Sequence, residues 1–190
     1  MLGAAGRTGR EVLRVAMARG HEVVAFSRKP FVAAVGVSVK LGDALDAGAV
    51  ADAIFGCDAL ICVVGPAPGA PANQDSRLAE VLMFAMRSAG VKRLALVTGA
   101  LQAASRSLGW FSRRLARLRS VRALVDDRHR LEQRLLASNL EVTILSSSCA
   151  FHTWERSHRV EIGSGSELEV HDLHIADVGD EVNGRHTRVA

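Results

Sequence analysis

Three glycines at the start of the chain have the spacing of a dinucleotide-binding turn. Gly3, Gly6 and Gly9 form the pattern G-x-x-G-x-x-G. Glycine lets the backbone turn sharply and approach a pyrophosphate closely, and the N-terminus of the following helix attracts negative charge. Apolar residues recur at helical spacing over residues 10–19, and Gly20 follows them as a helix C-cap would, so this stretch predicts that helix.

Cations follow the next predicted strand, which spans residues 21–26. Arg28 and Lys29 come directly after it, about twenty positions beyond the glycines, where an NAD-specific site usually places Asp or Glu to bind the ribose 2′-hydroxyl. A cation pairs instead with a 2′-phosphate. Arg7, inside the glycine turn, adds a third positive charge. The sequence therefore favours NADP(H) over NAD(H) as the cofactor.

Other residues of the site are predicted at the ends of later strands. Asp43 either accepts a hydrogen bond from the adenine amino group or simply forms a turn. Gly65 would let the nicotinamide half of the cofactor pass close to the backbone, and Thr98 would lie above the nicotinamide. No catalytic residue is assigned. The predicted cofactor-binding residues are Gly3, Gly6, Arg7, Thr8, Gly9, Arg28, Asp43, Gly65 and Thr98.

Apolar strands alternate with helices along the chain. Residues 59–64 and 93–98 are continuous apolar runs, typical of strands covered on both faces. The alternation predicts an α/β fold, a Rossmann-like doubly wound parallel sheet with helices on both faces. We expect one NAD(P)-binding domain over residues 1–190, since no linker or repeat interrupts the pattern. The other expected strands are 37–41 and 141–145, with weaker ones near 159–162 and 175–178, and the other helices are 47–54, 73–88 and 126–138.

The first strand of this sheet is expected to be truncated. Only Met1 and Leu2 precede the glycine turn, where a strand of about five residues is typical. That strand lies in the middle of such a sheet, so its loss should expose the edges of two neighbours. We therefore expect either that Met1 is not the natural start or that the gene model is truncated, and the short polar end at residues 181–190 suggests the same of the other terminus.

The composition argues against a membrane-spanning protein, a metal site and a nucleic-acid-binding protein. With 48% hydrophobic and 23% charged residues, the chain is an ordinary globular protein, and no apolar run approaches the roughly 20 residues of a membrane span. Three cysteines lack zinc-like spacing, so no metal is predicted and reduced thiols in the cytoplasm are expected. A net charge of +4 favours anionic ligands only weakly, and nucleic acid is not an expected partner.

A basic segment occupies residues 105–134, where nine arginines alternate with apolar residues. It predicts a basic amphipathic helix up to about Val125, which either binds an anionic membrane or nucleic acid or, as we favour, packs over the edge of the domain. A separate helix follows. Asp126, Asp127 and His129 open it and are interpreted as caps and dipole partners rather than as an acid–base cluster.

These segments together resemble the atypical short-chain dehydrogenases/reductases with NmrA-like NAD(P)-binding folds, within them the flavin reductase/biliverdin reductase B branch. The resemblance implies a Rossmann-like fold, NADPH binding and hydride transfer to a flavin, quinone, tetrapyrrole or similar small planar acceptor. It also fits the absence of tyrosine, since this branch does not use a Tyr-Lys pair. The matching segments are residues 3–9 (Gly-Ala-Ala-Gly-Arg-Thr-Gly), 20–23, 27–28, 42–43, 56–59, 89–93, 125–140 and 175–178.

The departures from the family pattern fall where the chemistry is expected. Gly99 stands where relatives usually carry serine, and Ser146 to Cys149 replace Arg-Pro-Gly or Pro-Pro-His, so Cys149 aligns with a histidine proton donor. Hydride transfer depends mainly on the cofactor. The first hypothesis is thus an NADPH-dependent reductase of a small molecule, which an arginine of the basic segment would bind if it is anionic. The alternatives are a non-catalytic NADP(H)-binding sensor or regulatory protein, and a damaged member that folds poorly alone.

Overall fold

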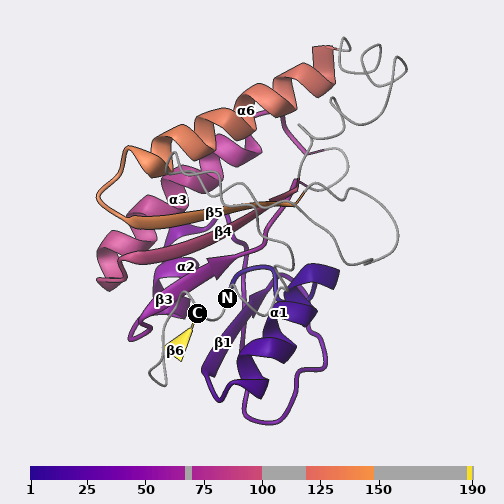
Figure 1. Ribbon diagram of the computed structural model, residues 1–190, viewed down its shortest axis with the longest axis vertical. Helices are drawn as coiled ribbons and strands as arrows, with labels where there is room; N and C mark the ends of the chain where they lie inside the picture. The colour runs from indigo at the N-terminus through magenta and orange to yellow at the C-terminus, as the bar shows by residue number, and fades with distance from the viewer. Residues whose placement is uncertain (67–69, 100–118, 148–187, 190) are drawn as a thin grey trace, which may run out of the picture.

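A parallel β-sheet forms the centre of the computed structural model, which describes residues 1–66, 70–99, 119–147 and 188–189 (Figure 1). All of its strand pairs are parallel. Within the described residues the sheet has six strands, in the order β2-β1-β6-β3-β4-β5. The strands are β1 (Glu22–Ser27), β2 (Ser38–Leu41), β3 (Ala59–Cys62), β4 (Arg93–Gly99), β5 (Glu141–Ser147) and β6 (Arg188–Val189).

Helices cover both faces of the sheet, as predicted. Side chains of successive strand residues point to opposite faces, so β1 contributes to two separate cores. Val23 and Ala25 pack in the cluster that contains the buried face of α1, whereas Val24 and Phe26 belong to the cluster of the other three helices. The α/β class with a doubly wound parallel sheet is therefore confirmed. The helices are α1 (Arg7–Ala18), α2 (Ala47–Ile54), α3 (Gln74–Ala89) and α6 (Arg119–Leu136).

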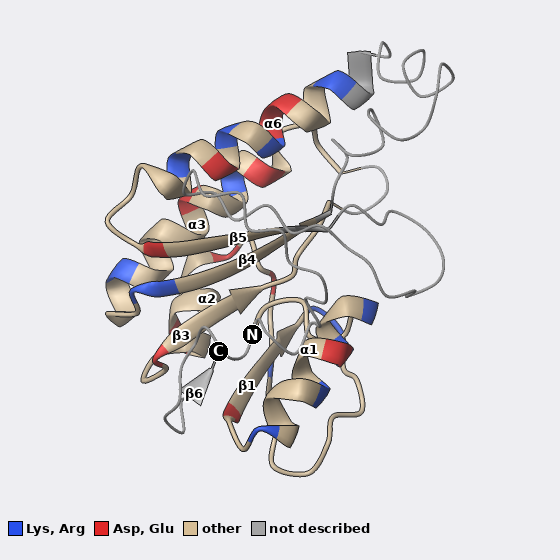
Figure 2. Cartoon of the chain, in the orientation of Figure 1, with Lys and Arg blue, Asp and Glu red and all other residues tan. Residues whose placement is uncertain are grey.

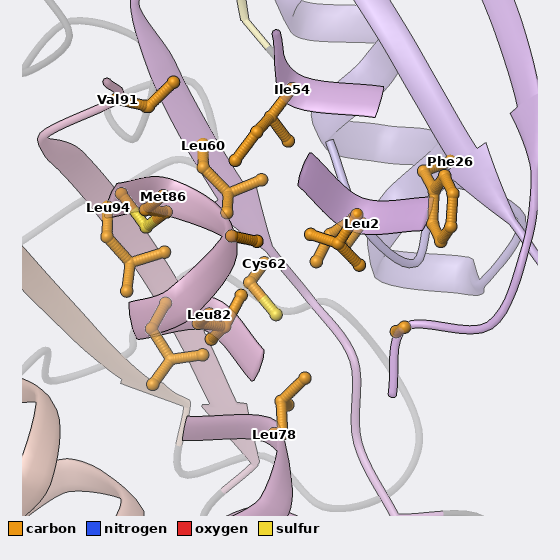
Figure 3. Close-up of a cluster of buried hydrophobic side chains, with 14 of the residues drawn as sticks. Leu2, Phe26, Ile54, Leu60, Cys62, Leu78, Leu82, Met86, Val91 and Leu94 are labelled. Carbon is orange, nitrogen blue, oxygen red and sulfur yellow. The ribbon is translucent and has the colours of Figure 1, made fainter. Parts of the chain in front are cut away.

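Two short pieces of chain occupy the position between β1 and β3 where the first strand was expected. Leu2 makes isolated parallel bridges to Phe26 of β1 and Cys62 of β3, and it lies between these two side chains in the core (Figure 3). Beside it, β6 pairs with Glu22 and Val23 on one side and with Ala59 on the other. The expectation that two strand edges would be exposed is thus wrong, because Leu2 and β6 cover them.

Helix α1 starts earlier than the expected residue 10. Gly6 has an extended backbone and is the N-cap of α1, and its carbonyl oxygen accepts the backbone N–H of Arg10 at 2.9 Å. Arg7, Thr8 and Gly9 therefore form the first turn of the helix rather than part of the preceding loop. The glycine pattern and the helix overlap, which a pattern of apolar residues alone does not reveal.

Helix α6 joins two segments that were expected to be separate helices. It is continuous through Val125 and Asp126, so Asp127 lies within it and does not open a helix. Most of the basic segment, residues 105–118, lies outside the described residues, as do the strands expected near 159–162 and 175–178. None of the described helices is both long enough and apolar enough to span a membrane.

Replacing Leu2 with alanine tests whether this residue connects the two halves of the sheet. Leu2 is completely buried, so Leu2→Ala should lower the free energy of unfolding by about 3 kcal/mol, measured by urea denaturation. The control is Leu41→Ala, the same change on the edge strand β2 at a side chain that is 56% exposed. Equal stability losses in the two variants would show that Leu2 does not hold the sheet together.

Candidate cofactor site

The glycine turn lies between β1 and β3, where the order of the strands in the sheet reverses. The backbone N–H of Gly3 donates to the carbonyl of Phe26 at the end of β1 (3.2 Å), and the N–H of Val63, just after β3, donates to Leu2 (3.1 Å). Strand β2 lies beyond β1 in one direction, and β4 and β5 lie beyond β3 in the other. In open α/β sheets, ligands bind at such a reversal of strand order, beyond the carboxyl ends of the strands.

The turn is packed too tightly for any residue other than glycine at two positions. Gly3 has a φ of +83°, and a Cβ there would lie 3.0 Å from the carbonyl oxygen of Val63. A Cβ on Gly9 would collide with the carbonyl oxygen of Gly3. Gly6 completes the turn, since its N–H donates to that same oxygen of Gly3 at 3.1 Å. The structure therefore brings the three predicted glycines together.

The N-terminus of α1 has the properties of an anion site. No side chain in the described ranges caps it, and its first turn contains no acidic residue. Helix N-termini leave backbone N–H groups without partners inside the helix and carry a partial positive charge. In this turn the side chains are those of Arg7, which is exposed, and Thr8, which is half-buried. These residues fit a pyrophosphate in both charge and hydrogen bonding.

Arg28 and Lys29 extend beyond the end of β1 as exposed side chains. The buried hydroxyl of Ser27 accepts the N–H of Lys29 (3.3 Å) and donates to its carbonyl oxygen (2.9 Å), which fixes the bend that carries Arg28. Because Gly3 is hydrogen-bonded to Phe26, this bend is next to the glycine turn. Both cations thus lie on the side of the turn where the adenosine ribose is expected.

The three remaining predicted site residues, Asp43, Gly65 and Thr98, lie in different environments. Asp43 is exposed, and its carboxylate accepts the N–H of Leu45 at 3.0 Å, so it forms the turn that was one of its two interpretations. At Gly65 an added Cβ would meet no atom of the described residues within 4 Å. With respect to these residues the backbone there is open, which a close approach by a ligand requires. Thr98 is buried near the carboxyl end of β4, and its cofactor contact remains a prediction.

A buried polar cluster beside Thr98 was not found from the sequence. Arg128 of α6 pairs with Asp75 of α3 through Nε and Oδ2 at 2.8 Å. Asp127 caps the N-terminus of α3, where its Oδ2 accepts the N–H groups of Asp75 (2.8 Å) and Ser76 (3.1 Å) and its Oδ1 accepts the hydroxyl of Ser76. The interpretation of Asp127 as a cap was thus right in kind, but the helix it caps is α3.

Glu132 lies beside this cluster. Burial raises the pKa of Glu132 above the usual glutamate value, and the side chain of Thr98 is among the groups that oppose this shift. Burial also raises the pKa of Asp75, against the opposing effect of Arg128.

The spacing of charges in α6 was the available sequence signal. Arg128 and Glu132 are four residues apart and therefore share one face of the helix. The buried Leu131 and Leu135 lie on the same side, so these charges interrupt a core-facing stripe. Both basic and acidic residues occur along α6 (Figure 2), and the exposed charges there are Arg122, Asp126, Arg130 and Arg134. Among the described residues, no group of three His, Cys, Asp or Glu side chains could hold a metal ion.

Comparisons with known proteins agree with this geometry. A family model described as NAD(P)H-binding matches residues 3–182. The anaerobilin reductase ChuY from Escherichia coli O157:H7 is 32% identical, with 77% of this chain and 70% of that chain covered and a TM-score of 0.55. The oxidoreductase ylbE from Lactococcus lactis is 24% identical over 76% of this chain and 67% of its own, with a TM-score of 0.59.

A third structure supports the fold alone. A short-chain dehydrogenase/reductase from Veillonella parvula in complex with NADP has a TM-score of 0.65 at 18% identity, with 95% of this chain and 82% of that chain covered. For several solved structures the chain spans about two thirds of their length. No curated protein matches the sequence.

The family match extends over nearly the whole chain and includes all nine predicted site residues. It confirms the resemblance to NAD(P)-binding reductases and, at the level of NAD(P)H, the predicted cofactor. The glycine turn, the parallel sheet and the family match thus lead to one conclusion: the chain belongs to the NAD(P)H-binding family.

Proposed function

We propose that the chain is an NADPH-dependent reductase that transfers a hydride to a flavin, a quinone, a tetrapyrrole or a similar small planar acceptor. The observation that carries this proposal is the glycine turn between the carboxyl ends of β1 and β3. The N-terminus of α1 follows this turn directly, and Arg28 lies beside it at the end of β1. The identity to ChuY, which is named as a reductase, supports the reaction class.

Each part of the cofactor would be held by a different element. The first-turn N–H groups of α1 would bind the pyrophosphate. Arg28, helped by Lys29 and Arg7, would pair with the 2′-phosphate, and the adenine would lie near Asp43. Gly65 would leave room for the nicotinamide, which supplies the hydride. We propose further that one domain holds this site and that the substrate is a small molecule.

Turnover distinguishes a reductase from a sensor. The purified chain should oxidise NADPH in the presence of flavin mononucleotide or menadione, followed as the loss of NADPH absorbance. Tight NADPH binding without turnover on either acceptor would contradict the reductase and favour the regulatory alternative. Absence of NADPH binding would contradict both.

Reversing the charge of Arg28 tests the preference for NADPH. Arg28→Asp should weaken NADPH binding about 100-fold, because a charge-assisted hydrogen bond contributes about 1.5–3 kcal/mol and the new carboxylate repels the phosphate. The affinity for NADH should change far less. Calorimetric titration measures both, with Arg87→Asp, an exposed site in the last turn of α3, as the control for net charge. Equal losses for the two cofactors would mean that Arg28 does not bind the 2′-phosphate.

A methyl group at Gly65 separates ligand contact from folding. Because no atom of the described part of the chain lies within 4 Å of a Cβ added at Gly65, Gly65→Ala should leave the thermal unfolding temperature unchanged. NADPH affinity should still fall about 10-fold, since the methyl group occupies the space that the nicotinamide half needs. The control is Gly48→Ala in α2, where an added Cβ makes only an ordinary contact. Unchanged NADPH affinity in Gly65→Ala would contradict the proposed position of the cofactor.

A further inference from the structure

We propose that Arg10 is a further cofactor-binding residue, whose guanidinium pairs with the pyrophosphate of the dinucleotide at the glycine turn. This inference rests on the cofactor site of the proposed function, but it concerns binding alone and does not require that the chain be a reductase. In that site the cations are assigned to the 2′-phosphate, so the pyrophosphate is otherwise offered only backbone N–H groups.

A hydrogen bond holds the Arg10 side chain against the glycine turn. Its Nε donates to the carbonyl oxygen of Ala5 at 3.2 Å. Ala5 lies between Gly3 and Gly6, inside the turn that the N–H of Gly6 closes onto Gly3. Helical side chains are tilted toward the N-terminus of their helix, and Arg10 belongs to α1. The guanidinium therefore lies beside the turn rather than along the body of the helix.

The bond to Ala5 leaves most of the guanidinium available to a ligand. An arginine side chain has five N–H donors in a rigid planar fork, and four of them are on the two Nη atoms. Arg10 is exposed, and its bond to Ala5 uses the donor on Nε. Because this bond orients the side chain before a ligand arrives, less conformational entropy is lost on binding. An oriented guanidinium fork suits the oxygens of a phosphate.

The positive charge of Arg10 is not neutralised by the acidic residue beside it. Glu11 pairs instead with Arg14, through Oε2 and Nε at 2.8 Å. None of the ion pairs formed among the described residues includes Arg10. The N-terminus of a helix carries only a partial positive charge. Arg10 thus adds a full charge at the position where α1 alone would supply part of one.

The alternative is that Arg10 only braces the turn through Ala5 and never meets the cofactor. Glutamine separates the two roles, because its Nε2 is the same number of bonds from Cα as the Nε of arginine. Arg10→Gln can therefore keep the donor to Ala5 while it removes the charge and both Nη groups. Arg10→Met has a side chain of similar length and removes the donor as well, whereas Arg10→Lys keeps the charge.

The first measurement is a calorimetric titration of the full chain with NADPH and with NADH. Both dinucleotides contain the pyrophosphate, so Arg10→Gln should weaken the binding of each about 10-fold, roughly the contribution of one charge-assisted hydrogen bond at an exposed site. Arg10→Met should show the same loss, and Arg10→Lys should recover most of the affinity. This pattern differs from that of Arg28→Asp, which should affect NADPH far more than NADH.

The second measurement divides the cofactor into its two anionic parts. Adenosine 2′-monophosphate carries the 2′-phosphate without a pyrophosphate, and ADP carries the pyrophosphate without a 2′-phosphate. Arg10→Gln should weaken the binding of ADP and leave that of adenosine 2′-monophosphate unchanged. The control is Arg14→Gln, the same substitution one turn further along α1 at an exposed arginine that pairs with Glu11. Its dissociation constants should stay within about twofold of wild type, and circular dichroism shows whether each variant is folded.

The outcomes separate the role of Arg10 from the site on which it rests. A wild-type chain that binds neither dinucleotide overturns both the proposed function and this role. If the wild-type chain binds NADPH and Arg10→Gln binds it equally well, the role of Arg10 alone is overturned, and a loss in Arg10→Met would then assign it to bracing the turn. A loss in Arg10→Gln that is confined to NADPH also overturns the proposal, because it would place the guanidinium at the 2′-phosphate.

Discussion

The backbone pairing of Leu2 with two strands at once is the interaction on which the site depends. The N–H of Leu2 donates to Ile61 of β3 (2.8 Å), the carbonyl of Met1 accepts the N–H of Phe26 of β1 (2.8 Å), and Gly3 then donates to Phe26. These bonds fix the glycine turn between the carboxyl ends of β1 and β3. The cations after β1 and the open backbone at Gly65 are placed around it as a consequence.

The two halves of the sheet present different groups to this point. Beyond the end of β1 lie Arg28 and Lys29, the charges that would recognise the phosphorylated ribose. Gly65 follows β3, and Thr98 lies near the end of β4. In the proposed function, a nicotinamide cofactor that extends across the turn would meet the cations on one side and Gly65 and Thr98 on the other.

Local patterns were sufficient to predict most elements of the fold. The apolar runs of β3 and β4 and the capped helix α2, whose N-terminal N–H groups bind Asp46, each carry their signal within a few residues. The role of β6 could not be predicted, because the pairing of two residues across the sheet depends on residues far away in the sequence. The early start of α1 was hidden for a different reason, since Gly9 is a poor helix former that is required here by its contact with Gly3.

The candidate site, like the fold, could be predicted only where its residues lie close together in the sequence. Its glycines and the cations after β1 were found because they follow one another at fixed spacing. The contacts of Arg128 with Asp75 and of Asp127 with Ser76 join residues from separate elements, which no local pattern reveals. A crystal structure of the chain with bound NADP⁺ tests most directly whether the glycine turn is the cofactor site. We predict that the pyrophosphate lies at the first-turn N–H groups of α1 and the 2′-phosphate against Arg28. A dinucleotide bound away from the glycine turn would contradict the proposed site.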